Sequence, residues 1–307
     1  MESKYQLQNY SYLRGAENKN PDMKHNNIVI MAGGVGSRLS PISTPEKPKQ
    51  FLDLLDCGET MIQSTYNRFL AADPQASVWV VTSEKYIQFV REQLPMIPVD
   101  QILTEPVGRG TASCAAYACW KIRKADPESV ITFTPSDAYL PDTVGFKKTF
   151  LEMTGFLESR KGVVCIGIRP TEPNTNYGYI QAPAAQGVVR VNNFKEKPNL
   201  ETAKLYYAEG CYFWNAGIFS WDASSLEKEI RRFLPATAAI MDELRPSFLT
   251  VTEASEVDRL FPSCENISID YAIMEKTDCA YMAQGRWEWN DLGTLSALEA
   301  VKKKIQK

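Results

Sequence analysis

Short apolar runs alternate with amphipathic segments along the first half of the chain. Each run is typical of a buried strand, and each intervening segment repeats its apolar positions at helical spacing. The predicted strands are 28–31, 77–82, 101–104, 130–134 and 163–168, and the predicted helices are 60–71, 84–94, 110–124 and 146–159. Strands separated by helices of this length predict a parallel sheet that is covered on both faces.

Beyond residue 170 the predicted strands become shorter and glycine punctuates them. This region predicts strands 177–181, 188–196 and 212–221, and helices 200–209, 223–233, 237–244 and 295–305. The simplest arrangement joins this portion to the first half through one continuous sheet. The predicted fold class is therefore α/β, with a Rossmann-like doubly wound sheet that is mixed but mostly parallel.

Residues 1–26 are polar and show no periodicity. They offer no apolar face that a core can bury, so we predict a poorly ordered leader before a folded body of residues 27–307. Met23, which lies directly before the body, is an alternative start of translation.

Composition and charge narrow the class of protein. Of the 307 residues, 44% are hydrophobic and 23% are charged, which is ordinary for a globular enzyme. A formal net charge of −3 gives no electrostatic reason to expect nucleic acid or an anionic membrane as a partner. No apolar run is long enough to cross a bilayer, and the amino terminus lacks the order of a secretory signal. We therefore expect a cytoplasmic protein.

The cysteines and the single histidine exclude several kinds of chemistry. The seven cysteines form no Cys-x-x-Cys pair, so we interpret them as reduced packing residues. The only histidine, His25, lies in the predicted leader, which excludes Ser-His-Asp and Cys-His catalysis from the folded body. The chemistry must use carboxylates, basic side chains, backbone amides and a hard metal ion.

The first predicted strand runs into a glycine-rich loop flanked by basic residues. The loop contains Ala32, Gly33, Gly34, Val35, Gly36, Ser37 and Arg38, and Lys49 follows a proline-rich stretch. Glycines let backbone N–H groups face a ligand at close range, and the two basic side chains would add contacts to phosphate oxygens. The pattern predicts a loop that binds a nucleoside triphosphate.

Other glycine motifs fit this loop less well. The dinucleotide fingerprint opens directly into a helix, which the prolines at 41, 45 and 48 prevent, and the Gly-x-x-x-x-Gly-Lys-Ser/Thr string occurs nowhere in the chain. An ordinary tight turn between a strand and a helix is the remaining alternative, and the adjoining basic residues argue against it.

Eight strings occur in a fixed order along the chain. They are MAGGVGSRLSPISTPEKPKQFLDL (31–54), TEPVGRGTA (104–112), TPSDAYL (134–140), NYGYIQ (176–181), FKEKPNLETA (194–203), FWNAGIFSW (213–221), ISIDYAIMEK (267–276) and WNDLGT (289–294). Together they resemble the sugar nucleotidylyltransferases, and specifically the mannose-1-phosphate guanylyltransferases. The resemblance implies the nucleotide-diphospho-sugar transferase type of fold, with a nucleotide-binding half at 27–170 and a sugar-binding half at 171–307. The family often carries a carboxy-terminal β-helix, but this sequence stops shortly after WNDLGT with a predicted helix, so no β-helix is expected, and a homodimer stays open.

The resemblance also implies a reaction. GMP would pass from GTP to mannose 1-phosphate, giving GDP-mannose and pyrophosphate without a covalent intermediate, while cations and a metal ion stabilise the charge of the transferring group. Two alternatives stay open. One is the same transfer with another base or sugar 1-phosphate, and the other is a noncatalytic regulatory subunit that binds GDP-mannose.

Four residues would carry the transfer. Asp137 follows a buried strand, where open α/β sheets place their ligands, although an aspartate there can also simply cap a turn. By resemblance, Asp137 and Asp291 together hold Mg2+, which takes one or two carboxylates plus phosphate oxygens. The resemblance gives Arg38 the departing pyrophosphate and Lys49 the α-phosphate, with Lys47 as the alternative to Lys49.

The acceptor sugar has its own candidates. By resemblance, Lys197 contacts the sugar phosphate and Glu196 the sugar hydroxyls, whereas in general such a dipeptide is a surface charge pair. Gly178, Asn215 and Gly217 would bring backbone and an amide side chain to the same ring.

The base site is predicted from donors and acceptors. Guanine presents N1–H and N2–H donors on one edge, so a carboxylate is its natural partner, and Glu105 is the candidate. Arg109 and Thr111 follow in the same string as nucleotide-binding residues. This string departs from the family at Gly110, where asparagine is usual, and Ala138 replaces the usual histidine after the metal aspartate.

Overall fold

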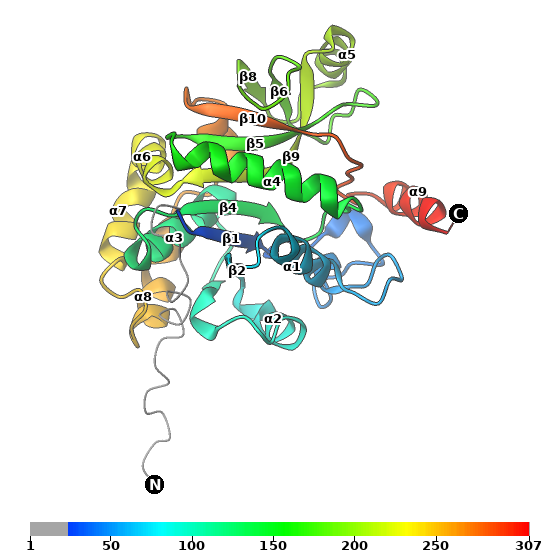
Figure 1. Cartoon of the computed structure of the whole chain (residues 1–307). Helices are drawn as coiled ribbons and strands as arrows, with labels where there is room; N and C mark the ends of the chain where they lie inside the picture. Colours follow the sequence, from blue (N-terminus) through cyan, green and yellow to red (C-terminus); the bar gives the residue numbers. More distant parts are fainter. Residues whose placement is uncertain (1–23, 307) are drawn as a thin grey trace.

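A mixed sheet forms the centre of the computed structural model, which describes residues 24–306 (Figure 1). Its main strands lie in the order β3-β2-β1-β4-β9-β5-β10-β7, and β6 and β8 extend it beside β9. The strands are β1 Asn26–Met31, β2 Ser77–Ser83, β3 Ile102–Glu105, β4 Val130–Pro135, β5 Val163–Ile168, β6 Tyr179–Gln181, β7 Val188–Arg190, β8 Asn193–Lys195, β9 Tyr212–Asp222 and β10 Ala280–Gly285. The α/β fold class with a single mixed sheet is confirmed, and the part of the chain that the structure describes holds no β-helix.

Two cores lie on opposite faces of this sheet because successive side chains of a strand point to opposite sides. In β1, Ile28 and Ile30 join one core, whereas Val29 joins the other. In β2, Val80 and Trp79 divide in the same way. A continuous apolar run is therefore the signature of a strand that is buried on both faces, as the sequence predicted.

Helices cover both faces (Figure 1). One core is covered by α1 Met61–Ala72, α2 Ile87–Gln93 and α4 Thr143–Glu158, and the other by α3 Gly110–Ala125, α6 Ala223–Phe233, α7 Pro235–Leu244 and α8 Glu253–Leu260. The helix α5 Leu200–Glu209 packs on β9. Among residues 24–306 we find no helix with both the length and the apolar character that crossing a bilayer requires.

The long strand β9 joins the two halves of the chain. It runs antiparallel between β4 and β5, and it also pairs antiparallel with β6. The strands β3, β2, β1 and β4 form the predicted parallel part, but β5 lies on the far side of β9 and pairs in parallel with β10. The predicted continuous sheet is therefore present, with the second half inserted into the first.

Some predicted elements differ from the structure. The predicted strand 188–196 is two short strands, because β7 pairs with β10 whereas β8 pairs with β6. The structure adds α8, the π-helical turn Asp270–Met274 and β10, none of which was predicted.

The predicted leader differs at its boundary. Residues 1–23 of the predicted leader lie outside the described residues, but Lys24 to Asn26 belong to the folded body. The placement of the only histidine, His25, in the leader was therefore wrong, although His25 directly precedes β1, at the opposite end of that strand from the glycine-rich loop. Lys24 Nζ lies 2.9 Å from Asp222 Oδ2, His25 Nε2 lies 2.8 Å from Ser77 Oγ, and Asn26 opens β1.

The last helix, α9 Leu295–Ile305, closes the molecule beside the loop that follows β1 (Figure 1). Its Leu298 and Val301 pack in a small separate core with Leu39, Leu54 and Met61. This packing brings the segment before α9 next to the glycine-rich loop. The chain therefore gathers loops from both ends of its sequence at one edge of the sheet.

Candidate active site

The glycine-rich loop leaves the carboxyl end of β1 and is shaped by a buried side chain. Gln50, which is 1% exposed in the short helix η3 (Lys49–Phe51), donates from Nε2 to the carbonyls of Ala32 (3.0 Å) and Gly34 (2.7 Å). Gly33 and Gly34 are exposed, and a Cβ added at Gly34 would meet nothing within 4 Å. A ligand can therefore approach the backbone closely at this point.

Gly36 allows the proline-rich segment to fold back onto the loop. Its φ is +65°, and a Cβ there would lie 2.9 Å from both Lys49 Cγ and Ser43 Oγ. Ser43 Oγ donates to the carbonyl of Val35 (2.8 Å) and accepts from the backbone N–H of Lys49 (2.9 Å). The glycine thus allows the segment that carries Lys49 to pack closely against the loop. The loop itself continues into the short helix η2 (Ser37–Leu39).

The Lys49 ammonium group joins two segments that are far apart in sequence. Its Nζ lies 3.0 Å from Asp137 Oδ2 and donates to the backbone carbonyl of Asp291 at 3.0 Å. Asp137 lies two residues beyond the end of β4, at the predicted edge of the sheet. Lys47, by contrast, is exposed. Of the two lysines, the structure therefore brings Lys49 to the candidate carboxylates.

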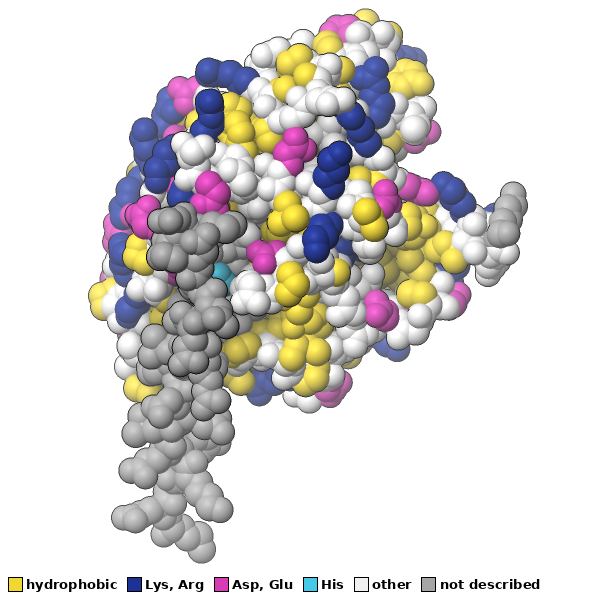
Figure 2. Space-filling view, viewed as in Figure 1, with side chains coloured by type: hydrophobic (Ala, Val, Ile, Leu, Met, Phe, Trp, Pro, Cys, Tyr) yellow, Lys and Arg dark blue, Asp and Glu magenta, His cyan; other side chains and the backbone are white. Residues whose placement is uncertain are grey.

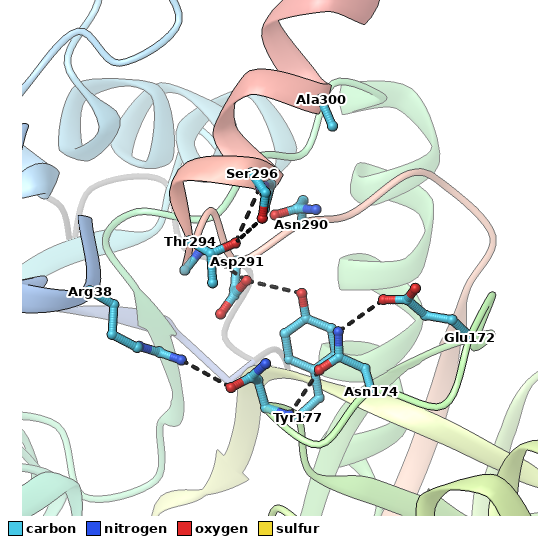
Figure 3. A pocket seen from close by; sticks show the side chains of 12 residues that line it. Arg38, Glu172, Asn174, Tyr177, Asn290, Asp291, Thr294, Ser296 and Ala300 are labelled. Carbon is cyan, nitrogen blue, oxygen red and sulfur yellow. Dashed lines mark hydrogen bonds between the residues drawn. The ribbon is translucent and has the colours of Figure 1, made fainter. Parts of the chain in front are cut away.

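Asp291 is held by two donors. Its Oδ1 accepts from the Tyr177 hydroxyl and from the backbone N–H of Gly293, each at 3.0 Å (Figure 3). The Tyr177 ring lies 5.0 Å from the rings of both Trp214 and Trp289, in edge-to-face contacts. Burial and the charge of Asp291 raise the pKa of Tyr177, so its hydroxyl stays protonated and donates.

Two neighbouring cavities share this wall. One of about 470 Å3 is lined by Arg38 and Asp291 and by the start of α9, and Arg38 Nη1 donates to Asn176 Oδ1 at 3.4 Å (Figure 3). The other, of about 220 Å3, is lined by Asp137 and Asp291 and also by Asn176 and Tyr177. The candidate cations and carboxylates therefore converge on one continuous region.

Basic and acidic side chains lie close together on the face of the molecule shown in Figure 2, among exposed apolar ones.

The predicted sugar residues line the smaller cavity, whose lining includes Gly178, Glu196, Lys197, Asn215 and Gly217. The backbone N–H of Asn215 donates to the carbonyl of Gly178 at 2.8 Å, which sets these two residues side by side. A Cβ at Gly178 would lie 2.6 Å from Glu196 Oε2, so only glycine leaves the carboxylate where it is.

Glu196 and Lys197 both reach this cavity because β8 ends at Lys195. Glu196 is 7% exposed and its carboxylate pairs with the Lys197 ammonium group, whereas half of the Lys197 side chain is exposed. The φ of Lys197 is +42°, a left-handed conformation that is uncommon for a residue with a side chain. The break from regular strand geometry explains how adjacent side chains face one pocket.

Asp270 also lines the smaller cavity, and the sequence did not predict it. It begins the π-helical turn Asp270–Met274, and its Oδ1 accepts from Asn215 Nδ2 at 3.2 Å. Burial, together with the charge of Glu196, raises the pKa of Asp270 to about 7. The string ISIDYAIMEK was one signal for it, but an aspartate in a helical string usually faces solvent.

Of the predicted base residues, Glu105 and Arg109 lie outside the lining of the smaller cavity, whereas Thr111 lines it. Glu105, 8% exposed at the end of β3, has an Oε1 without a hydrogen-bond partner among residues 24–306, and Arg109 Nε is in the same condition. A Cβ at Gly33 would lie 3.5 Å from Glu105 Oε2. Burial raises the pKa of Glu105 to about 7. A buried acceptor and a buried donor without partners point to a polar ligand group.

The start of α3 ties this region to the turn that carries Asp270. Thr111 Oγ1 accepts from the backbone N–H of Ile269 at 2.9 Å. The φ of Gly110 is +72°, and a Cβ there would lie 2.4 Å from the carbonyl oxygen of Ile267. Glycine at this position therefore permits a close backbone contact that a larger residue would prevent.

The donor set fits magnesium held jointly with a ligand. Among residues 24–306 no group of three or more His, Cys, Asp or Glu side chains is placed to hold a metal ion. Asp137 and Asp291 line one cavity, however, and magnesium is commonly bound by one or two carboxylates together with substrate phosphates. The fixed orientation of Asp291 by Tyr177 resembles the way outer hydrogen bonds orient metal-binding carboxylates.

The strand order and the loops at its edge define an open α/β protein of the nucleotide-diphospho-sugar transferase type. UDP-glucose pyrophosphorylase complexed with UDP-glucose shares this fold over 92% of the chain, with a TM-score of 0.59 and 15% identity. A protein of Thermus thermophilus, described as a mannose-1-phosphate geranyltransferase, is more similar. It matches 90% of this chain and 78% of its own, with a TM-score of 0.79 and 29% identity.

The profile of the Nucleotidyl transferase family matches residues 27–307, and the chain belongs to this family. Xanthan biosynthesis protein XanB of Xanthomonas campestris pv. campestris (strain B100) is 37% identical over 274 residues, which cover 88% of this chain and 58% of that protein. Mannose-1-phosphate guanylyltransferase of Salmonella montevideo is 36% identical over 290 residues, which cover 90% and 60%. The chain therefore spans less than two thirds of the length of these relatives.

Proposed function

We propose that this protein transfers GMP from GTP to mannose 1-phosphate, giving GDP-mannose and pyrophosphate. The observation that carries the proposal is the convergence at one cavity of phosphate-binding and sugar-binding chemistry. Lys49 contacts Asp137, and Asp137 and Asp291 line the same cavity as Glu196 and Asn215. Membership of the family supports nucleotidyl transfer, and the relatives' names support the guanine base and the mannose sugar.

Arg38 and Lys49 would bind different phosphates of the triphosphate. Arg38 lines the larger cavity, so its guanidinium group would neutralise the departing pyrophosphate. Lys49 lies at the carboxylates and would hold the α-phosphate. The backbone N–H groups of residues 32–37 would contact the same phosphates. A sugar phosphate attacks without a general base, so these contacts need only bring two anions together and stabilise the transferring group.

Asp137 and Asp291 would hold Mg2+. When bound, the ion supplies charge neutralisation to the phosphate oxygens of both substrates. Tyr177 and Gly293 keep Asp291 Oδ1 occupied, which leaves the other oxygen of that carboxylate for the ion. Lys49 already contacts Asp137, so this carboxylate is the meeting point of the cationic groups.

The smaller cavity would hold the sugar phosphate. Lys197 is half exposed and can reach the sugar phosphate, while the buried Glu196 accepts hydrogen bonds from ring hydroxyls. Gly178 and Gly217 allow the backbone to approach the ring, and Asn215 adds an amide.

Glu105 and Arg109 would read the base. The carboxylate accepts from guanine N1–H and N2–H, and the guanidinium group can donate to the O6 acceptor of the same base. Both side chains hold a buried polar atom without a partner among residues 24–306, which a guanine would supply. Thr111 fixes the start of α3 beneath them.

Two alternatives have weaker support. The departures at Gly110 and Ala138 favour testing other bases and sugars, because both positions lie near the proposed substrates. A noncatalytic GDP-mannose-binding subunit would have less need of Lys49 and two carboxylates at one site. A homodimer and a cytoplasmic location stay predictions from the sequence.

The test is a substrate panel. Purified protein is incubated with Mg2+, each of the four ribonucleoside triphosphates and a series of hexose 1-phosphates, and released pyrophosphate is measured. The proposal expects the highest kcat/KM with GTP and mannose 1-phosphate. Release with a different pair would replace the substrates, and tight GDP-mannose binding without release from any pair would favour the noncatalytic alternative.

A further inference from the structure

Besides Asp137, Asp291 and Glu196, one more acidic side chain lines the smaller cavity, and none of the proposed steps uses it. Asp270 stands at the first position of the π-helical turn Asp270–Met274 and lines the cavity together with Glu196 and Asn215. A π-helical turn is rare and often occurs at functional sites. The turn is fixed from outside, because Thr111 holds the neighbouring backbone N–H of Ile269.

Placing this carboxyl next to Glu196 is unfavourable for the empty protein. Burial and the charge of Glu196 both disfavour the ionised form of Asp270, and the Lys197 ammonium group offsets only part of that effect. Glu275, which follows the same turn, accepts from the backbone N–H of Glu196 and pairs with Lys195. Asp270 and Glu196 therefore lie close together in a pocket that also holds Asp137 and Asp291, an arrangement that a purely structural role of Asp270 does not require.

The acceptors of this cluster are only partly used within the protein. Asn215 Nδ2 donates to Asp270 Oδ1, and Asn215 Oδ1 accepts from the backbone N–H of Gly217 at 2.9 Å. The amide is thus locked in one orientation and fixes the Asp270 carboxyl in turn. Ser268 also contributes a hydrogen bond to this carboxyl. A carboxylate offers about four lone-pair sites, so Asp270 still retains acceptor capacity toward the cavity.

Sugar hydroxyls are the ligand groups that such a cluster recognises. Each hydroxyl is a donor, and a hydrogen bond to a carboxylate is about twice as strong as one between neutral groups. Glu196 and Asp270 offer two carboxyl acceptors in one pocket, and the glycine at 178 lets a ring approach them.

We propose that Asp270 is a sugar-binding residue that accepts a hydrogen bond from a ring hydroxyl next to the one bound by Glu196, so that the two carboxyls together select the configuration of adjacent hydroxyls. This inference rests on the proposed function and assigns part of its sugar specificity. Asn215 positions Asp270, and the π-helical turn sets its distance from the ring.

The experiment is a double-mutant cycle in which one change is made in Asp270 and the other in a hydroxyl of the sugar. KM is measured for mannose 1-phosphate and for its 2-, 3- and 4-deoxy analogues with the wild type and Asp270→Asn. At about pH 8, where Asp270 is ionised despite its raised pKa, the variant should raise KM for mannose 1-phosphate by about 10- to 100-fold, with KM for GTP unchanged, because a hydrogen bond to a charged group is lost. For one deoxy analogue, KM with the wild type should be as high as KM for mannose 1-phosphate with the variant. For that analogue, Asp270→Asn should cause no further rise in KM.

Asp278→Asn is the matched control, because Asp278 is exposed and lies outside the cavity. If the amide disturbs the turn, Asp270→Ser is the second variant. A crystal structure of the wild type with GDP-mannose gives an independent readout, in which Asp270 should lie within about 3.2 Å of a ring hydroxyl.

The inference and the proposed function fail differently. An unchanged KM in Asp270→Asn without coupling to any deoxy analogue, or a carboxyl beyond hydrogen-bond distance in the complex, would overturn the inference and leave the transfer reaction standing. Pyrophosphate release from no substrate pair would overturn the proposed function itself.

Discussion

Replacing Glu105 with glutamine tests the buried carboxyl at the proposed base site. Burial raises the pKa of Glu105 from 4.5 to about 7, so the folded protein keeps a proton where the unfolded chain has lost it. Because the pKa is higher in the folded state, the contribution of Glu105 to the free energy of unfolding is fully present below pH 4.5. It is lost as the pH rises through 7. The difference corresponds to about 3 kcal/mol of folding free energy at pH 8.

The assay is urea denaturation of the wild type and Glu105→Gln at a series of pH values from about 4.5 to about 8.5. Glutamine does not titrate, so the stability of the variant relative to the wild type should rise by about 3 kcal/mol across this range. If the glutamine amide lacks hydrogen-bond partners, the free energy of unfolding of the variant falls by the same amount at every pH. The slope of its dependence on pH is then unchanged. Glu128→Gln, at an exposed position, is the control. Parallel pH profiles of the wild type and Glu105→Gln would refute the reasoning.

The same variant has an expected effect on substrate choice. A charged carboxylate that accepts from guanine contributes about 1 to 3 kcal/mol of discrimination, so Glu105→Gln should reduce the preference for GTP over ATP by about 5- to 150-fold. The turnover number with GTP should change less. If turnover falls while the base preference stays, Glu105 acts in another role.

Three further substitutions test the geometry around the cavity. Tyr177→Phe removes a donor to Asp291 and should weaken metal binding about 10-fold, measured by titrating Mn2+ in the presence of GDP-mannose and by the Mg2+ dependence of the rate. Gly178→Ala places a Cβ 2.6 Å from Glu196 Oε2 and should raise KM for the sugar phosphate about 10-fold, with KM for GTP unchanged. Gly110→Asn adds a Cβ that would lie 2.4 Å from a backbone carbonyl, so the free energy of unfolding should fall by about 2 kcal/mol or more in a denaturation assay.

Each of these variants has a control or a contradicting result. Tyr179→Phe removes a hydroxyl whose partner is the backbone of Asn174, so metal binding should not change. Gly155→Ala adds a Cβ that meets nothing within 4 Å, so KM should not change. Wild-type metal binding in Tyr177→Phe, wild-type KM in Gly178→Ala, or wild-type stability in Gly110→Asn would contradict the geometry described above.

The elements of the first half could be predicted because their strands are buried on both faces. Ile28 and Val29 serve opposite cores, so the sequence there is apolar without interruption. Asp137 stands out for the same reason, as the first acidic residue after such a run. Its position at the edge of the sheet follows from the direction of the strand.

The second half was harder because tertiary pairing decides it. The sequence of β10, AYMAQG, has weak strand propensity and becomes a strand by lying between β5 and β7. The run 188–196 divides because its two parts have different partners.

Two site residues were missed for a related reason. Tyr177 was not predicted as a site residue; its ring packs on tryptophans, as a core residue's does, but its hydroxyl reaches a carboxylate more than a hundred residues away. Asp270 joins the cavity through the π-helical turn and through its contact with Asn215, which lies 55 residues earlier in the sequence. Contacts of this kind join residues that are far apart in the sequence. The local sequence pattern therefore does not reveal them, and they form only in the completed fold.

Pyrophosphate release from GTP and mannose 1-phosphate with Mg2+, compared between the wild type and Asp137→Asn, tests the central claim most directly. The wild type should turn over, and the variant should lose about 100- to 1000-fold in kcat while its equilibrium affinity for GTP changes by less than about 10-fold. Turnover by Asp137→Asn at the wild-type rate would contradict the claim that carboxylates and cations at this cavity bring the two phosphates together.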